Sequence, residues 1–128
     1  MSYCMSRKLE MPMDKARAAA EEGLAAEGFG ILTEIDVQDT LKQKLDVDHP
    51  PYRILGACNP AYAYEALQSE PQVGTMLPCN VILREISDGV VEISAIDPTA
   101  SMQAIGNPEL AGVARTIRNK LDKVIASL

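Results

Sequence analysis

Two short segments of the chain, residues 56–60 (GACNP) and 77–81 (LPCNV), each place a cysteine and an asparagine beside a proline. Their cysteines, Cys58 and Cys79, are 21 residues apart. An accessible thiol acts as a nucleophile, a redox group or a soft-metal ligand, whereas a buried one packs as a small hydrophobic side chain. These two segments are therefore the first place to look for chemistry.

Cys58 lies directly before an expected helix start at Asn59-Pro60. The helix dipole and the free N–H groups of the first turn favour a thiolate there, so Cys58 is a candidate catalytic nucleophile or redox sensor. The structural alternative is a buried thiol without reactivity, which is common for free cysteines. The sequence leaves both interpretations open.

Cys79 opens the next expected strand, directly after Pro78. If that strand lies beside the one that ends at Cys58, the two thiols meet at one end of the sheet, and Cys79 is a second candidate catalytic residue. Two close thiols can form a regulatory disulfide, hold a soft metal such as Cu(I), or pass on a persulfide. Cys4 lies in neither segment, and we expect no function for it.

Two asparagines and two arginines are candidate ligand-binding residues. Asn59 suits the cap of the following helix, whereas Asn80 precedes a strand and either holds a turn or binds a ligand through its amide. Arg53 and Arg84 lie among apolar residues on expected strands. They either hold a carboxylate or phosphate in a guanidinium fork or pair with Glu85, Glu92 or Asp97.

Other kinds of site have little support in the sequence. His49 is the single histidine and lies in a polar loop, so we expect neither a histidine-rich metal site nor a Cys-His pair. The chain contains no glycine-rich nucleotide or phosphate motif, no Gly-x-Ser-x-Gly and no Cys-x-x-Cys. We therefore predict no metal ligand and no particular cofactor.

The composition narrows the class of protein. The 128 residues include 47% hydrophobic and 4% aromatic side chains, enough for one aliphatic core, and the net charge of −6 argues against nucleic-acid binding. The densest basic group, Arg115, Arg118, Lys120 and Lys123, lies on an expected helix and is a candidate for contact with an anionic partner. An odd number of cysteines, with no apolar run suited to a signal peptide or membrane span, predicts a cytoplasmic protein with reduced thiols.

The expected elements place the two Cys-Asn segments at the ends of strands. We predict strands over residues 3–9, 29–35 and 52–58, and a hairpin from about 79 to 97. We predict helices from Pro12 to just before Gly28, over 37–45 with Asp36 as cap, from Asn59-Pro60, and from Asn107-Pro108. Asp88-Gly89 is the expected hairpin turn, with positive φ at both positions and Ser87 opposite Val90.

This turn predicts the register of the hairpin. It places Glu85 directly opposite Glu92. One face would carry Ile82, Arg84, Ile86, Val91, Ile93 and Ala95, and the other would carry Val81, Leu83, Glu85, Glu92, Ser94 and Ile96.

The order β-α-β-α-β-α-β-β-α predicts a single α+β domain over residues 1–128. We expect a largely antiparallel sheet with helices on one side. A second copy of the chain would close the other face or an edge strand, so we expect a homodimer.

Several of these segments also carry a resemblance to a known family. Residues 28–37, 51–60 and 77–81, together with Asp97-Pro98, resemble the bacterial and archaeal domain-of-unknown-function family numbered 302. The resemblance extends over nearly the whole chain. It implies a small homodimeric α+β domain and implies no established activity.

Three hypotheses for function follow. The first is a module that binds a small ligand or a sulfur species near Cys58, Asn59, Cys79 and Asn80. The second is a thiol-dependent redox enzyme or sensor with Cys58 as nucleophile and Cys79 as resolving residue. The third is a structural or interaction protein in which both thiols are packed.

Overall fold

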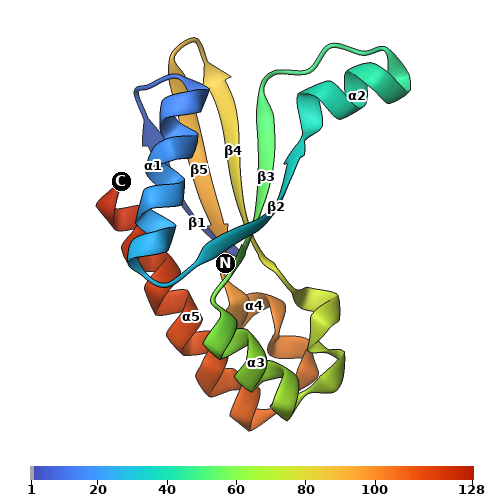
Figure 1. Ribbon diagram of the computed structural model, residues 1–128, viewed down its shortest axis with the longest axis vertical. Helices are drawn as coiled ribbons and strands as arrows, with labels where there is room; N and C mark the ends of the chain where they lie inside the picture. The colour runs from blue at the N-terminus through green and yellow to red at the C-terminus, as the bar shows by residue number, and fades with distance from the viewer. Residues whose placement is uncertain (1) are drawn as a thin grey trace.

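The computed structural model describes residues 2–128, and its helices and strands follow nearly the expected order (Figure 1). The strands are β1 (Cys4–Leu9), β2 (Gly30–Asp36), β3 (Tyr52–Cys58), β4 (Cys79–Ser87) and β5 (Val90–Ile96). The α-helices are α1 (Met13–Ala26), α2 (Val37–Leu45), α3 (Pro60–Ser69), α4 (Pro98–Ser101) and α5 (Pro108–Ser127). Two 3₁₀ turns, η1 (Pro71–Met76) and η2 (Gln103–Ile105), complete the chain, and α4 and both 3₁₀ turns were not predicted.

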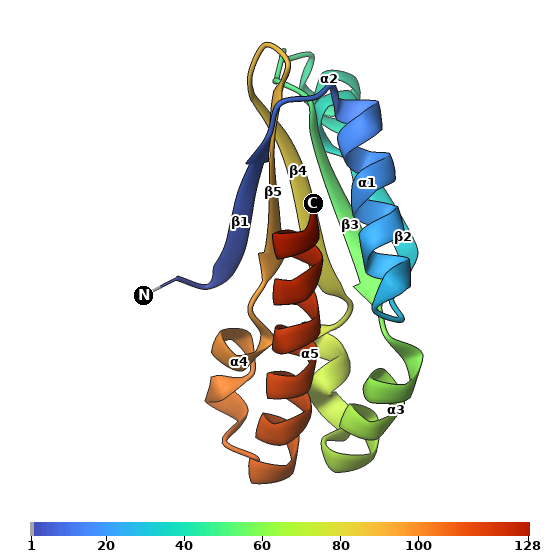
Figure 2. The same ribbon diagram turned by 90° about the vertical axis from the view of Figure 1, so that its left-hand side faces the viewer.

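All five strands form one antiparallel sheet in the order β1-β5-β4-β3-β2. Strands that are consecutive from β2 to β5 are neighbours, and β1 crosses over to pair with β5 at the far edge. α1 and α5 cover one face of this sheet, and α3 and α4 lie at its lower end (Figures 1 and 2). The predicted α+β class with an antiparallel sheet is therefore confirmed. None of the helices within residues 2–128 has both the length and the apolar character needed to cross a membrane.

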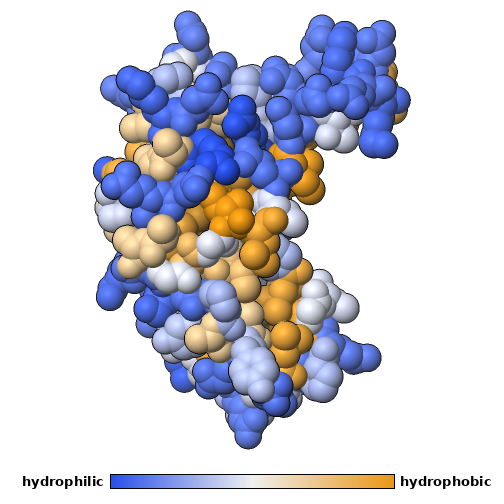
Figure 3. Space-filling model, in the orientation of Figure 1, coloured by the Kyte–Doolittle hydropathy of each residue, from blue (hydrophilic) through white to orange (hydrophobic). Residues whose placement is uncertain are grey.

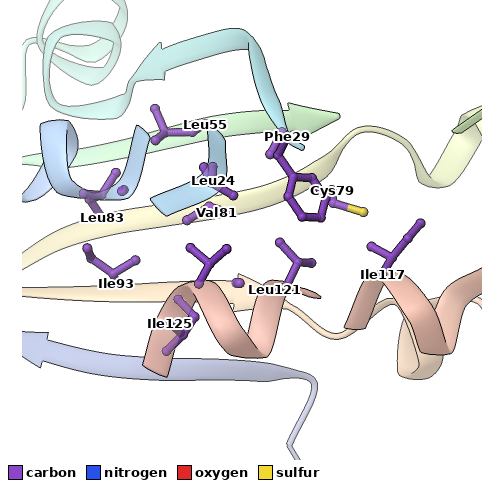
Figure 4. Packing of buried hydrophobic residues seen from close by; sticks show 14 of the residues in the cluster. Leu24, Phe29, Leu55, Cys79, Val81, Leu83, Ile93, Ile117, Leu121 and Ile125 are labelled. Atoms are coloured by element: carbon purple, nitrogen blue, oxygen red, sulfur yellow. The ribbon is translucent and has the colours of Figure 1, made fainter. Parts of the chain in front are cut away.

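The core lies between the sheet and the helices α1 and α5 (Figure 4). Leu55, Leu83 and Ile93 on the sheet are fully buried, as are Leu24 of α1 and Leu121 of α5. Small residues on α1 let the two helices approach closely, and a Cβ on Gly23 would lie 3.3 Å from Val124 Cγ1. Aliphatic packing at this distance compensates for the scarcity of aromatic side chains.

The predicted register of the β4–β5 hairpin is wrong. Ser87 does pair with Val90 around the expected turn, where Gly89 has a φ of +74° but Asp88 does not have a positive φ. A β-bulge between Glu85 and Ser87 then shifts every later pair by one position, so that Arg84 and not Glu85 lies opposite Glu92. A one-residue shift exchanges the two faces of a strand. Val81 and Leu83 of β4 therefore lie on the same face as Val91, Ile93 and Ala95 of β5, whereas the prediction placed these two groups on opposite faces. The buried face carries Val81, Leu83, Val91, Ile93 and Ala95.

Within residues 2–128, no helix layer covers the other face of the sheet, which we call the open face. Its register aligns Ile35 on β2 with Ile54 on β3, and Ile54 with Ile82 on β4. Beside the open face, α2 projects from the upper end of the sheet. None of its nine residues is buried, and Leu45 is 66% exposed. Apolar surface extends from below α2 across β2 towards α3 (Figure 3).

Candidate functional site

A cavity of about 290 Å³ lies where the end of β3 and the start of β4 meet α3 and α5. Apolar side chains make up most of its wall, with two thiols and one amide as the polar groups. We call this cavity the thiol pocket, and its lining residues are Phe29, Leu32, Ala57, Cys58, Asn59, Ala63, Ala66, Leu67, Leu77, Pro78, Cys79, Met102, Val113 and Ile117.

β3 pairs with β4, which is the condition under which we expected Cys58 and Cys79 to meet, and this pairing brings both cysteines to one end of the sheet. Cys79 lies directly opposite Ala57, so Cys58 is one residue further along the neighbouring strand. Both cysteines line the thiol pocket, and both are free thiols. No group of three or more histidine, cysteine or acidic side chains suited to a metal ion occurs within residues 2–128.

The two thiols differ in their surroundings. Cys79 is 5% exposed, and Figure 4 shows it beside Phe29 with Ile117 on the neighbouring helix. Burial, and secondarily the nearby Cys58, raises the pKa of the Cys79 thiol to about 11, so this thiol stays protonated at neutral pH. Cys58 is only partly buried and lies two positions before the start of α3. Cys58 is therefore the thiol of this pair that a ligand reaches more easily.

Asn59 holds the wall of the pocket in a way that the sequence did not predict. Its side chain makes no cap bond to α3, and the expectation of a capping asparagine is wrong at this position. Instead, Asn59 Nδ2 donates a hydrogen bond to the Glu27 carbonyl oxygen at 3.2 Å. Gly28, with a φ of +87°, follows Glu27 and brings the backbone after α1 close to this amide. Asn59 thus joins the end of α1 to the start of α3.

Asn80 lies apart from the thiol pocket. It is exposed and pairs with Gly56 on the open face, whereas the preceding Cys79 points into the core. Alternation of side chains along β4 separates the two members of this Cys-Asn dipeptide. Of the four residues in the two Cys-Asn dipeptides, three therefore line the thiol pocket and the fourth, Asn80, lies on another surface.

Arg53 and Arg84 also lie outside the thiol pocket, and both have acidic partners. Arg53 Nη1 lies 3.4 Å from Glu34 and its Nη2 lies 3.6 Å from Asp14. Arg84 Nε donates to Glu92 at 2.8 Å, one of the acidic partners that the sequence suggested for it. This arrangement favours the alternative of structural ion pairs over a guanidinium fork for a ligand.

His49 and Cys4 are likewise distant from this site in the fold. His49 Nδ1 lies 2.7 Å from the Pro50 carbonyl oxygen, in the loop after α2. Cys4 lies on the edge strand β1. The two tyrosines of α3 differ in their surroundings: Lys120 Nζ lies 5.8 Å from the Tyr62 ring centroid, whereas Tyr64 is 67% exposed.

Most of the residues that line the thiol pocket could not be predicted from the sequence. Phe29, Ala66, Met102 and Ile117 come from four different segments, and each one looks like an ordinary core residue in the sequence. Met102 follows α4, which was not predicted. The only usable signal was that both Cys-Asn segments lie at strand ends.

Comparison with known proteins agrees with the fold and with the resemblance. The family model described as "Domain of unknown function DUF302" matches residues 5–128. The crystal structure of an uncharacterized conserved protein DUF302 from Bacillus stearothermophilus is similar to this chain, with 28% sequence identity, a TM-score of 0.90 and coverage of 98% of each chain. No curated protein matches. The chain therefore belongs to the DUF302 family.

Proposed function

We propose that this protein binds a small, largely apolar ligand or a sulfur species in the thiol pocket. The observation that carries the proposal is that one pocket, lined mainly by apolar side chains, contains two neighbouring thiols and the Asn59 amide. Its volume of about 290 Å³ is close to the lower end of the usual range for small-molecule sites, which suits a compact ligand.

The difference between the two thiols favours binding over redox exchange. In the redox alternative Cys79 resolves the disulfide formed at Cys58 and must attack it as a thiolate, but the raised pKa of Cys79 keeps that thiol protonated at neutral pH. A neutral, polarizable thiol in an apolar wall suits contact with a soft sulfur atom or an apolar group. Cys58 and Cys79 act in this proposal as contact groups, with Asn59 as the single amide.

Native mass spectrometry of the anaerobically purified protein tests this proposal. We expect an adduct after exposure to a polysulfide solution, reduced in Cys58→Ser and unchanged in Cys4→Ser, which removes a thiol on β1 as the matched control. Equal adducts in all three proteins would contradict a specific site. A stable Cys58–Cys79 disulfide without an adduct would support the redox enzyme or sensor instead.

We also propose that two copies of the chain pair through the open face and α2. The aligned Ile35, Ile54 and Ile82 and the exposed Leu45 provide apolar surface that a second copy would cover. A nine-residue helix such as α2 gains little stability on its own, which supports a partner against its apolar side.

The distribution of charge also supports a second copy of the chain as the partner. Lys44 on α2 and Glu65 on α3 take part in no ion pair within residues 2–128, and no lysine or arginine lies between Arg53 and Arg84. Placing α2 of one copy along α3 of the other would bring these opposite charges together.

The three free thiols also fit the reducing cytoplasm, which we propose as the compartment.

A further inference from the structure

A second cavity, of about 580 Å³, lies between the α4–η2 segment and α5. Two arginines of α5, Arg115 and Arg118, line it together with the polar side chains of Thr99 and Gln103. Met102 lines both this cavity and the thiol pocket, so the two cavities lie on either side of one methionine. We call the second cavity the arginine cavity.

Arg118 is held in place by a hydrogen-bonded carboxylate. Its Nε donates to Asp97 Oδ2 at 3.1 Å, while Asp97 Oδ1 accepts from the Thr99 N–H at 2.9 Å and from the Thr99 hydroxyl at 2.6 Å. Burial alone would raise the pKa of Asp97, but the bonds from Thr99 and then from Arg118 hold that pKa below its ordinary value. The carboxylate therefore stays ionised at neutral pH and fixes one edge of the guanidinium.

The outer part of Arg118 remains available. Its two terminal nitrogens make no hydrogen bond within residues 2–128, so they can still donate. An arginine that is anchored at Nε and free at its terminal nitrogens has lost much of its rotational freedom before a ligand arrives. Such preorganisation reduces the entropic cost of binding.

Arg115 lies one turn before Arg118 on the same side of α5 and adds an uncompensated positive charge. It is exposed, and no carboxylate forms an ion pair with it among residues 2–128. The residues that line the cavity include no aspartate or glutamate. In a chain with a net charge of −6, this is a local reversal of sign.

We propose that the arginine cavity binds a small organic oxyanion, with its carboxylate or phosphate group between Arg115 and the terminal nitrogens of Arg118. A guanidinium donates two parallel hydrogen bonds to either group, so the two arginines recognise the chemistry that carboxylates and phosphates share. The volume of the cavity exceeds what an inorganic anion fills, and Met102, Ala111 and Ala114 give an apolar wall for the rest of such a molecule. This inference stands apart from the ligand proposed for the thiol pocket.

Isothermal titration calorimetry at constant ionic strength tests it with three probes that share one ring. Phenyl phosphate and benzoate carry the two candidate groups, and benzyl alcohol carries no charge. We expect saturable binding of at least one of the two anions and none of benzyl alcohol. Arg115→Gln should weaken that binding at least tenfold, because a charge-assisted hydrogen bond is lost. The anion that binds more tightly identifies the natural group as phosphate or carboxylate.

Lys123→Gln is the matched control, since it removes the same charge from an exposed position further along α5. Binding should persist in this variant. An equal loss in both variants would show diffuse attraction and overturn the proposal, as would binding of benzyl alcohol with equal strength or no saturable binding of either anion. Because Arg115 is exposed, its replacement should leave the melting temperature unchanged, which separates lost binding from lost folding.

Discussion

At the scale of single residues, the burial of the Cys79 thiol leads us to predict that the protein loses stability at alkaline pH. Its pKa is raised by burial to about 11 in the folded protein, whereas the same thiol ionises near pH 9 when it is unfolded. Ionisation therefore favours the unfolded chain, and the contribution of Cys79 is complete below pH 9 and is lost as the pH rises to 11. We expect the free energy of unfolding to fall by up to roughly 2–3 kcal/mol over this range.

Urea unfolding at several pH values measures this loss. Other groups titrate in the same range, so the comparison is between variants. Cys79→Ala should flatten the dependence on pH, even if it lowers stability at neutral pH through the lost packing, and Cys4→Ala should keep the full dependence. The same slope in both variants would contradict the assignment to Cys79.

A second prediction at this scale concerns Gly56, because the residues around it leave no room for a side chain. A Cβ at Gly56 would overlap Thr33 Oγ1 and would lie 2.7 Å from Pro78 Cγ. We expect Gly56→Ala to destabilise the fold by about 1–3 kcal/mol, the range for overpacked positions. Thermal or urea unfolding measures the effect.

Two further variants define the cause of this loss. Thr33→Ala in the Gly56→Ala background should recover part of the stability, because it removes the overlapping oxygen. Gly112→Ala is the control in a helix with open space around it, and it should stabilise the protein by about 0.5–1 kcal/mol. Failure of the double variant to recover would place the strain at Pro78.

At the scale of elements, the two Asn-Pro helix starts have the same sequence pattern but different bonding. Asn107 accepts from the Glu109 N–H at 3.0 Å and also donates to the Ser69 carbonyl oxygen at 3.0 Å, whereas Asn59 donates one bond to Glu27. We expect Asn107→Ala to cost about 2 kcal/mol and Asn59→Ala about 1 kcal/mol. Asn107→Asp should recover the cap but not the bond to Ser69, and urea unfolding compares the variants. Equal costs for the two alanine variants would be inconsistent with these bonds.

Local sequence signals predicted most of the elements. The β3 strand, α2 with its Asp36 cap, and the start of α5 are found at their predicted positions, because each has turn or capping residues at its ends. The sequence named the pairing of β3 with β4 only as the condition under which the two cysteines meet, and this pairing is found and brings them into one pocket. These features depend on residues that are close together in the sequence.

Features that depend on distant contacts were not predictable in this way. Nothing in residues 79–97 marks the bulge that shifts the hairpin register, since Ile86 suits either face of a strand. Asn59 caps no helix, and its amide instead donates to the Glu27 carbonyl, more than thirty positions earlier in the chain. The thiol pocket likewise combines side chains as distant in the sequence as Phe29 and Ile117, which only the tertiary fold brings together.

At the scale of the whole molecule, the projecting α2 gives a prediction about assembly. Leu45 is 66% exposed in a single copy, so Leu45→Glu should leave the fold of that copy intact. In the proposed dimer the same substitution buries a charge at the interface, and we expect it to shift the protein from dimer to monomer in sedimentation equilibrium.

Ala18→Glu provides the control for this experiment, since it adds the same charge at an exposed position on α1, within the helical layer. This variant should remain dimeric. A wild-type protein that sediments as a monomer, or a Leu45→Glu variant that stays dimeric, would argue against the proposed interface.

The crossover of β1 has a consequence for the order in which the sheet assembles. Residues paired between β1 and β5 are 82 to 92 positions apart, from Leu9–Val91 to Cys4–Ile96, whereas β2, β3 and β4 each pair with the next strand along the chain. Closing so long a loop costs more entropy than forming the nearer pairs, so β1 is expected to join the sheet last. The same strand should detach first in the native protein, with its amide hydrogens exchanging for deuterium sooner than those of β4 while the other four strands stay assembled.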